Sequence, residues 1–182
     1  MPDRAAIVTG ASSGIGLAIA RMLGEQGYGI TAAARRPDKL AAAAEELRGA
    51  GIEVEDVAGN MADEADIQRV VAAHRDRFGR LDVLVNNAGI GVGATFDAHA
   101  TKRIDLQIAV NLRAIVLFYR ECADMLKAAG AEHRNALVVN TASIAGKSGQ
   151  GWPALPERED MFTTSALRCS APAALSMSAH SR

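Results

Sequence analysis

TGASSGIG, residues 9–16, is the stretch that decides the fold of this chain. A short apolar run precedes it at residues 5–8, and an amphipathic helical segment follows it. Gly10 permits a sharp turn out of a strand, Gly14 lets a pyrophosphate approach backbone amides, and Gly16 allows the helix to pack closely. The stretch therefore predicts a dinucleotide-binding loop. The alternative is a turn of small residues that holds no ligand.

Length, composition and charge limit the class of protein. A chain of 182 residues with 49% hydrophobic content can bury one substantial core but is short for two domains. Its net charge of −1 gives no general attraction to nucleic acid or to anionic membranes. The sequence has no signal-peptide core and no apolar run near the ~20 residues that span a bilayer. We expect a soluble, cytoplasmic protein that binds neither nucleic acid nor membrane.

Cysteines and histidines suggest no metal site. Cys122 and Cys169 lack the spacing of a metal or redox motif, which favours two free thiols. The histidines are scattered singly among polar neighbours, so each is expected at the surface: His74, His99, His133 and His180. We predict that the protein holds no metal.

Apolar runs and amphipathic segments alternate along the chain. Strands are expected at residues 5–9, 28–34, 52–58, 81–85 and 135–141, and helices at about 14–26, 37–48, 63–77 and 102–129. This alternation predicts an α/β fold, a Rossmann-like doubly wound parallel sheet that stops after the fifth strand. The last strand should be buried on both faces. In the long helix, the stripe expected in the core is Ile108, Leu112, Ile115 and Tyr119.

Three further motifs follow the glycine-rich loop in a characteristic order. Asn-Asn-Ala-Gly at residues 86–89 ends the fourth strand, Asn111 lies in the long helix, and Asn-Thr-Ala-Ser at residues 140–143 leaves the fifth strand. Together with TGASSGIG, this set resembles the short-chain dehydrogenase/reductase family over about residues 4–151. The resemblance implies an NAD(P)-binding domain at residues 1–151 and hydride transfer between a nicotinamide and a carbonyl or alcohol substrate. It also implies a homodimer or homotetramer.

The resemblance also assigns the cofactor-binding residues. They come from the glycine-rich loop, from the end of the third strand and from the end of the fourth: Gly10, Ser12, Ser13, Gly14, Ile15, Gly16, Asn60, Met61, Asn87, Ala88 and Gly89. Asn60 stands where the family usually has an aspartate that contacts adenine, so binding there should survive, though weakened. Asn87 can also stabilise a turn at a strand end, and both roles are compatible.

Arg35 and Arg36 bear on the choice of cofactor. They follow the second strand, where a carboxylate would bind the ribose hydroxyls of NAD and cations would accept the extra phosphate of NADP. No carboxylate precedes Asp38 there, so the sequence favours NADP over NAD. Two arginines on a solvated face are the alternative, although without an anion they would sit unfavourably beside a helix start.

The resemblance implies four catalytic residues, of which two can be placed. Ser143 would stabilise charge on the substrate oxygen, and Asn111 would hold a helix kink and a water of the proton relay. The family's tyrosine, and the lysine four residues after it, should follow Ser143 by twelve or thirteen positions. Neither residue is present at these positions, and the only tyrosines of the sequence are Tyr28 and Tyr119.

The composition changes after Gly151. Residues 152–182 show neither strand alternation nor a helical stripe, so we expect a disordered tail or out-of-frame translation. Codons for residues 155–160, read one base later, can encode the missing tyrosine and lysine. A frameshift would explain both the change of composition and the missing pair. The alternatives are a splice variant and a divergent C-terminus. Two functions remain open: an NADP-dependent oxidoreductase that is impaired as written, or a non-enzymatic dinucleotide-binding remnant or partner-binding module.

Overall fold

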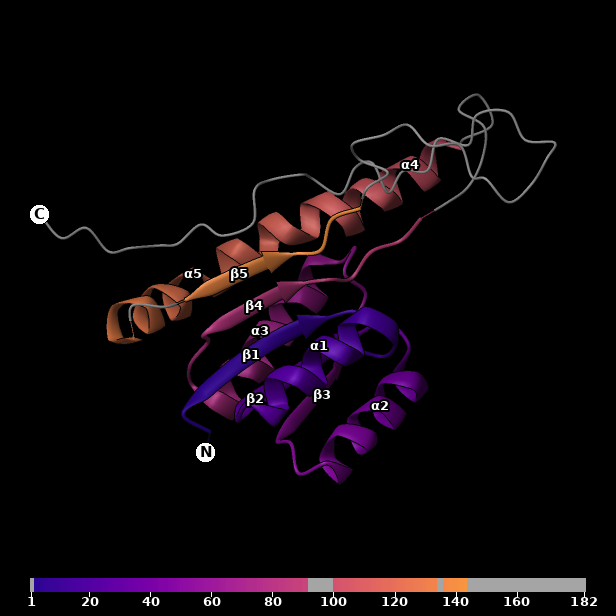
Figure 1. The fold of residues 1–182 in the computed structure, drawn as a ribbon. Helices are drawn as coiled ribbons and strands as arrows, with labels where there is room; N and C mark the ends of the chain where they lie inside the picture. The colour runs from indigo at the N-terminus through magenta and orange to yellow at the C-terminus, as the bar shows by residue number, and fades with distance from the viewer. Residues whose placement is uncertain (1, 92–99, 134–135, 144–182) are drawn as a thin grey trace, which may run out of the picture.

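Five parallel strands form a central sheet in the computed structural model, which describes residues 2–91, 100–133 and 136–143. Across the sheet the order is β3-β2-β1-β4-β5 (Figure 1). The strands are β1 (Arg4–Thr9), β2 (Tyr28–Ala34), β3 (Val54–Ala58), β4 (Val83–Asn86) and β5 (Leu137–Asn140). Because the chain proceeds from the central β1 first to one side and then to the other, the sheet is doubly wound. This confirms the predicted α/β, Rossmann-like fold.

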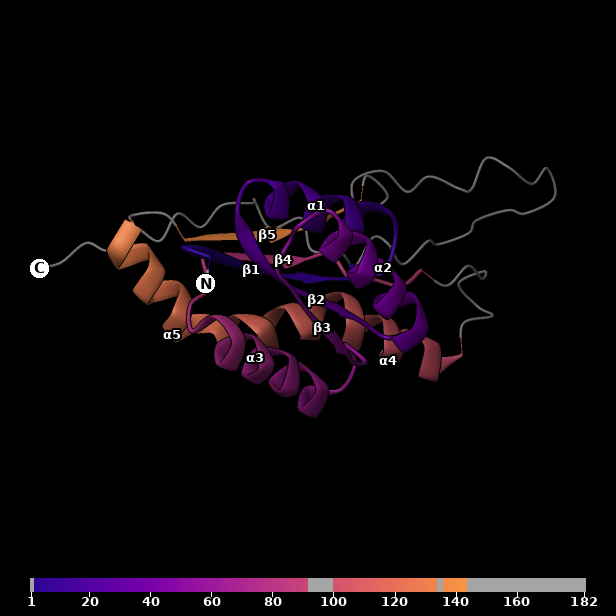
Figure 2. The ribbon, with the colours of Figure 1, turned by 90° about the horizontal axis from the view of Figure 1, so that it is seen from below.

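Helices cover both faces of this sheet. The view in Figure 2 places α1 (Gly14–Glu25) and α2 (Pro37–Gly49) on one face. The other face carries α3 (Glu64–Phe78) and a long helical run. That run consists of α4 (Thr101–Ile108), the π-helical turn η2 (Ala109–Arg113) and α5 (Ala114–His133). The β-α alternation expected from the apolar pattern is therefore present.

The two faces bury separate hydrophobic cores. Successive side chains of a strand point to opposite faces, so Ile7 of β1 packs with Phe118 of α5, while Val8 packs with Leu40 of α2. Ile7, Val8, Leu40 and Phe118 are all fully buried. Because both faces of β1 are covered, its carboxyl end is held rigidly at the centre of the sheet.

The long helix corrects the predicted core stripe. Ile108 and Leu112 are 40% and 36% exposed, whereas the residues that pack on the sheet include Val110, Leu117 and Phe118. The π-helical turn contributes to this difference, because its wider turn shifts the side chains that follow relative to a regular 3.6-residue period. Ile115 is half-buried and Tyr119 packs against the core, so the predicted stripe is wrong at Ile108 and Leu112 only.

Strand β5 is also less buried than expected. It lies at the edge of the sheet formed by the described residues, and its Leu137 is 37% exposed. Within the described part of the chain, β5 pairs with β4 alone, in a register that places Asn86 opposite Asn140. The prediction that this strand is buried on both faces is therefore wrong. The tail at residues 152–182 lies outside the described residues.

His74 lies in the core rather than at the surface, which corrects another prediction. Its side chain has no exposed area; Nδ1 lies 2.7 Å from Thr31 Oγ1, and Nε2 lies 2.7 Å from the Arg80 carbonyl oxygen. Since a carbonyl can only accept, Nε2 carries the hydrogen and the Thr31 hydroxyl donates to Nδ1. Burial lowers the pKa of His74 to about 4, against the opposing effects of the Arg80 carbonyl and the Asp82 charge. The His74 ring is therefore neutral, and its hydrogen bond with Thr31 joins α3 to β2.

Other groups with possible chemistry take no part in a site. Cys122 is a buried free thiol, and burial raises its pKa to about 12; Cys169 lies outside the described residues. Among the described residues, no three His, Cys, Asp or Glu side chains gather where a metal ion could bind. None of the described helices is both long and apolar enough to cross a membrane.

Candidate functional site

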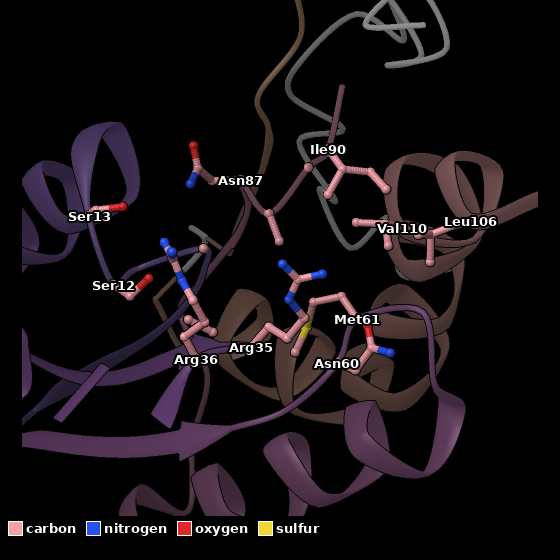
Figure 3. Close-up of a pocket in the computed structure, with 14 residues that line it drawn as sticks. Ser12, Ser13, Arg35, Arg36, Asn60, Met61, Asn87, Ile90, Leu106 and Val110 are labelled. Atoms are coloured by element: carbon pink, nitrogen blue, oxygen red, sulfur yellow. The ribbon is translucent and has the colours of Figure 1, made fainter. Parts of the chain in front are cut away.

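A cavity of about 530 Å³ opens at the carboxyl ends of the central strands. Parallel α/β sheets bind ligands at this edge, where the strand order reverses between β1 and β4. Figure 3 shows the lining side chains converging from several loops. Predicted cofactor residues that line it are Gly10, Ser12, Ser13, Arg35, Arg36, Asn60, Met61, Asn87, Ala88 and Gly89. The fold therefore brings together segments that are far apart in the sequence.

The glycine-rich loop passes very close to the end of β4. Gly10 has a φ of +71°, and its amide donates a 2.7 Å hydrogen bond to the Ala33 carbonyl. A Cβ on Gly16 would lie 2.3 Å from the Gly10 carbonyl oxygen and 2.5 Å from Asn87 Nδ2. Only glycine fits at residue 16 without a shift of the backbone. Gly16 itself packs under the loop and does not line the cavity.

The N-terminus of α1 is open to an anion. Ser13 is the N-cap, but its side chain makes no capping bond, and the first turn of α1 has no acidic residue. A Cβ on Gly14 would meet nothing within 4 Å. The first amides of a helix lack partners inside the helix and carry a partial positive charge, so this end suits a phosphate. Ile15 is 64% exposed and, like Gly14, does not line the cavity.

Thr9 fixes the loop after β4. Its buried hydroxyl donates to the Val85 carbonyl at 3.3 Å and accepts the amides of Asn87 and Ala88, each at 2.9 Å. In return, Asn87 Nδ2 donates to the Thr9 carbonyl at 3.0 Å. Asn87 therefore has the structural role that the sequence left open, and its position in the cavity wall is compatible with a ligand contact as well.

Arg35 and Arg36 supply the charge of the cavity. Both side chains are exposed, and Figure 3 shows them extending from the end of β2 toward the space between Ser12 and Met61. No ion pair joins either arginine to a carboxylate within the described part of the chain, whereas Arg77, for example, pairs with Glu53. The lining contains no Asp or Glu. The cavity thus presents two uncompensated cations, which favour an anionic ligand.

The end of the cavity opposite the glycine-rich loop is more apolar. In Figure 3, Met61 and Asn60 lie on the same side as Leu106 and Val110. The Asn60 side chain accepts the Ala62 amide at 3.1 Å. The Asn60 amide in turn donates to Asp66, which helps to hold the pKa of that carboxyl below its ordinary value.

Several lining residues were not predicted from the sequence: Ala34, Ile90, Leu106 and Val110. Leu106 and Val110 are four residues apart, so they share a helix face across the start of η2. That spacing is a signal in the sequence, but it does not tell which apolar face of a long helix will meet the cavity. Ala34 and Ile90 adjoin predicted residues, and adjacency in the chain would have found them.

The two placeable catalytic residues lie near the cavity but do not line it. Asn111 is buried in η2, where its Nδ2 donates to the Ile90 carbonyl at 2.8 Å and its Oδ1 accepts the Ile90 amide at 2.9 Å. Ser143 is half-buried and follows β5 by three residues, at the same edge of the sheet as the cavity. The structure therefore gives Asn111 an observed positioning role on Ile90.

Neither tyrosine of the chain is in the cavity wall. Tyr28 accepts a hydrogen bond from Arg4 at 3.1 Å, on the amino-terminal side of the sheet. Tyr119 on α5 accepts a 3.4 Å bond from Asn140 Nδ2, and Asn140 in turn accepts from Asn86 at 2.9 Å. These contacts tie strands and helices together.

A doubly wound sheet with a glycine-rich turn, an open helix N-terminus and two cations at one cavity is typical of Rossmann-like domains, in which such a turn binds phosphate. The family model described as short chain dehydrogenase matches residues 4–155. The chain therefore belongs to the short-chain dehydrogenase family, as the sequence motifs indicated.

Relatives and solved structures agree with this assignment. The "Granaticin polyketide synthase putative ketoacyl reductase 1" of Streptomyces violaceoruber is 42% identical over 146 residues, covering 79% of this chain and 52% of the relative. A crystal structure of an actinorhodin polyketide ketoreductase variant with NADPH matches with a TM-score of 0.73 at 37% identity, over 81% of this chain and 56% of that one. A short-chain dehydrogenase/reductase from Burkholderia phymatum in complex with NAD matches with a TM-score of 0.75 at 30% identity, over 81% and 51%. The present chain thus spans about half the length of these proteins.

Proposed function

We propose that this chain is the cofactor-binding part of an NADP(H)-dependent reductase that acts on a carbonyl or alcohol substrate. The observation that carries the proposal is that one cavity joins the glycine-rich loop to Arg35 and Arg36 without any lining carboxylate. The ketoreductase relatives favour a ketoacyl compound as the substrate. A cytoplasmic location and a homo-oligomeric state, expected from the sequence, belong to the same proposal.

The residues present fit a dinucleotide phosphate. Gly14 leaves open space before the first turn of α1, and Gly16 lets the loop approach Asn87 more closely than any side chain would permit. The amides at the start of α1 would bind the pyrophosphate. Arg35 and Arg36 would bind the additional phosphate of NADP, because a guanidinium donates paired hydrogen bonds to phosphate oxygens. Asn60 and Met61 would contact the adenine.

Carbonyl reduction requires a hydride and a proton. The bound cofactor supplies the hydride, Ser143 would donate a hydrogen bond to the substrate oxygen, and Asn111 would hold the Ile90 segment in place. The sequence offers no tyrosine beyond Tyr119 to transfer the proton, and no lysine at the expected spacing. We therefore propose that the chain as written binds cofactor but turns over slowly or not at all.

The missing tyrosine and lysine also favour a second candidate. A non-enzymatic dinucleotide-binding remnant, or a module that binds a partner, would need the fold but no proton donor. Turnover separates the reductase from both forms of the second candidate, and cofactor binding separates a partner-binding module from the other two. Sequencing the coding DNA adds a separate test of the frameshift, because a shifted frame should continue with strand and helix patterns after Gly151.

The first experiment is a calorimetric titration of the purified chain with NADPH and NADH. We expect tighter binding of NADPH, and a double Arg35→Ser, Arg36→Ser variant should lose about 10- to 100-fold of that affinity, because charge-assisted hydrogen bonds contribute about 1.5–3 kcal/mol. NADH affinity should change little. Arg75→Ser is the matched control, since Arg75 is exposed in the last turn of α3 and does not line the cavity.

The same samples should be assayed for NADPH oxidation with a panel of ketones and ketoacyl thioesters. Slow oxidation with tight NADPH binding supports an impaired reductase, and binding without any oxidation fits a reductase without a proton donor as well as a dinucleotide-binding remnant. Rapid oxidation would mean that another residue supplies the proton and that the proposed impairment is wrong. A chain that binds neither nucleotide would favour the partner-binding module.

A further inference from the structure

Thr141 directly follows β5 and contacts two consecutive residues at the end of β4. Its amide donates to the Asn86 carbonyl at 3.0 Å, and its Oγ1 donates to Asn87 Oδ1 at 3.3 Å. The backbone bond continues the pairing of β4 with β5, in which Asn86 lies opposite Asn140. The sheet itself therefore holds the Thr141 hydroxyl beside Asn87.

The Asn87 amide is held from two strand ends. Its Nδ2 donates to the Thr9 carbonyl at 3.0 Å, while its Oδ1 accepts from Thr141. Because the Thr9 carbonyl can only accept, the amino group faces Thr9 and the amide oxygen faces Thr141. A Cβ on Gly10 would lie 2.8 Å from the same Nδ2, so the amino group packs directly against the glycine-rich loop. Within the described residues, one N–H of this amino group has an acceptor, and the other remains for a ligand.

We propose that Thr141 is a positioning residue for the dinucleotide site, where its hydroxyl holds the Asn87 amide with the amino group toward the glycine-rich loop. This inference rests on the proposed function. Asn87 lines the cavity, and Figure 3 shows its amide extending toward the side of Ser12 and Ser13, where α1 begins. A pyrophosphate at the amides of that helix end would accept a hydrogen bond from the second N–H of Asn87 Nδ2.

The contact between Thr141 and Asn87 links the last described strand to the cofactor site. Thr141 does not line the cavity, so its effect on a ligand passes through Asn87. An amide that two partners already hold loses less conformational freedom on binding than an amide that one partner holds. By linkage, a bound dinucleotide strengthens the contact by the same factor by which the contact strengthens binding. The nucleotide should therefore also hold the end of β5 more firmly on β4.

The test compares Thr141→Val and Thr141→Ser with the parent chain. Valine keeps the branched shape without the hydroxyl, and serine keeps the hydroxyl. In calorimetry well below the melting temperature, Thr141→Val should weaken NADPH and NADH binding about 2- to 10-fold, the range of one net hydrogen bond. The factor should be the same for both nucleotides, because both contain the pyrophosphate. Thr141→Ser should bind both as the parent does.

Thr31→Val is the matched control. It also removes a hydroxyl with a side-chain partner, since Thr31 Oγ1 lies 2.7 Å from His74 Nδ1, but Thr31 does not line the cavity. This variant should have a lower melting temperature and unchanged affinity for both nucleotides. Hydrogen exchange gives a second readout: saturating NADPH should slow exchange of the amides of residues 137–141 more in the parent and in Thr141→Ser than in Thr141→Val.

Three results would overturn the inference. Unchanged affinity of Thr141→Val, even with a lower melting temperature, would show that the hydroxyl stabilises the sheet alone. An equal loss of affinity in Thr141→Ser would show that the shape of the side chain matters rather than its hydroxyl. Weaker NADPH binding with unchanged NADH binding would place the effect away from the pyrophosphate. In each case the parent still binds nucleotide, whereas a parent that binds neither nucleotide contradicts the proposed function itself.

Discussion

The half of the molecule that holds the glycine-rich loop differs from the half built around β5. In the first half, β2 is buried along nearly its whole length, and α1 and α2 cover one face of its sheet. In the second, the helical run leaves an apolar ridge exposed at a constant spacing of four residues: Ile104, Ile108, Leu112 and Val116. The first half also exposes two large apolar side chains, Ile15 and Met22 on α1, so the two halves differ in the number and regular spacing of such residues. Since the loop and both cavity arginines belong to the first half, cofactor binding should depend mainly on that half.

The strongest test of the first half is Gly16→Ala. A Cβ at this position would overlap the Gly10 carbonyl at 2.3 Å, and backbone atoms cannot move aside as a flexible side chain can. We expect the free energy of unfolding to fall by about 3 kcal/mol or more, at the upper end of overpacking effects. NADPH binding should be lost in calorimetry, because the phosphate loop can no longer close on Asn87.

Gly49→Ala is the matched control for this substitution. Gly49 ends α2, and a Cβ there would meet nothing within 4 Å. Alanine should be neutral or stabilise the protein by up to about 1 kcal/mol, with unchanged NADPH affinity. Equal effects of the two substitutions would contradict the close approach of the loop to Asn87.

Sequence reasoning was most successful in this first half. β2 and the start of α2 were predicted to the residue, because the apolar run at residues 28–34 is followed by two arginines and Pro37, which favours the first turn of a helix. Ten of the lining residues between Gly10 and Gly89, all except Ala34, were among the residues singled out from the sequence, because they occupy strand ends that a parallel sheet brings to one edge. Direct roles of these residues in binding a ligand remain predictions.

The helical spacing of His74 could have indicated from the sequence that it is buried, but it could not have identified its hydrogen-bond partners. His74 was expected at the surface because its chain neighbours are polar, yet it continues the helical stripe of Ile67, Val70 and Phe78, all of them buried. A polar residue on a buried stripe needs partners from other elements. Thr31 and Arg80 supply them, and no local pattern identifies such distant partners.

The burial of neutral His74 in the first half can be tested by measuring the free energy of unfolding as a function of pH. The folded-state pKa of about 4 lies below the ordinary 6.5, so the unfolded chain takes up a proton as the pH falls below 6.5 while the folded chain does not until near 4. The free energy of unfolding should therefore decrease between pH 6.5 and 4, by up to about 3 kcal/mol from this group. Denaturant unfolding at several pH values measures the change.

A His74→Gln variant isolates the contribution of His74 to the pH dependence of stability. This variant cannot take up the proton, so its stability should fall less than that of the parent over the same pH interval. Protonation of carboxylates with a lowered pKa, such as Asp66, decreases the free energy of unfolding of both proteins equally. This effect therefore cancels in the difference between the two proteins. Identical pH profiles for the two proteins would show that the ring is not buried in neutral form.

The second half explains the main failure of the sequence analysis. Ile108 and Leu112 fit a helical stripe as well as Val110 and Leu117 do, because the run is apolar on more than one side. Periodicity cannot choose between two such stripes, and the π-helical turn at Ala109–Arg113 breaks the period between them. Contact with α3 and the sheet decides which stripe is buried.

The smallest expected effect comes from Val116→Lys, which tests whether the ridge is exposed in the protein. Val116 is 60% exposed, whereas its chain neighbour Leu117 is 7% exposed and belongs to the core. Denaturant unfolding should change by less than about 0.5 kcal/mol for Val116→Lys, as for most surface substitutions, and by several-fold more for Leu117→Lys, which buries a charge. Light scattering on heating should begin at a higher temperature for Val116→Lys, because a cation in the ridge divides the apolar patch. A loss of stability as large as that of Leu117→Lys would mean that the ridge is covered in the folded protein.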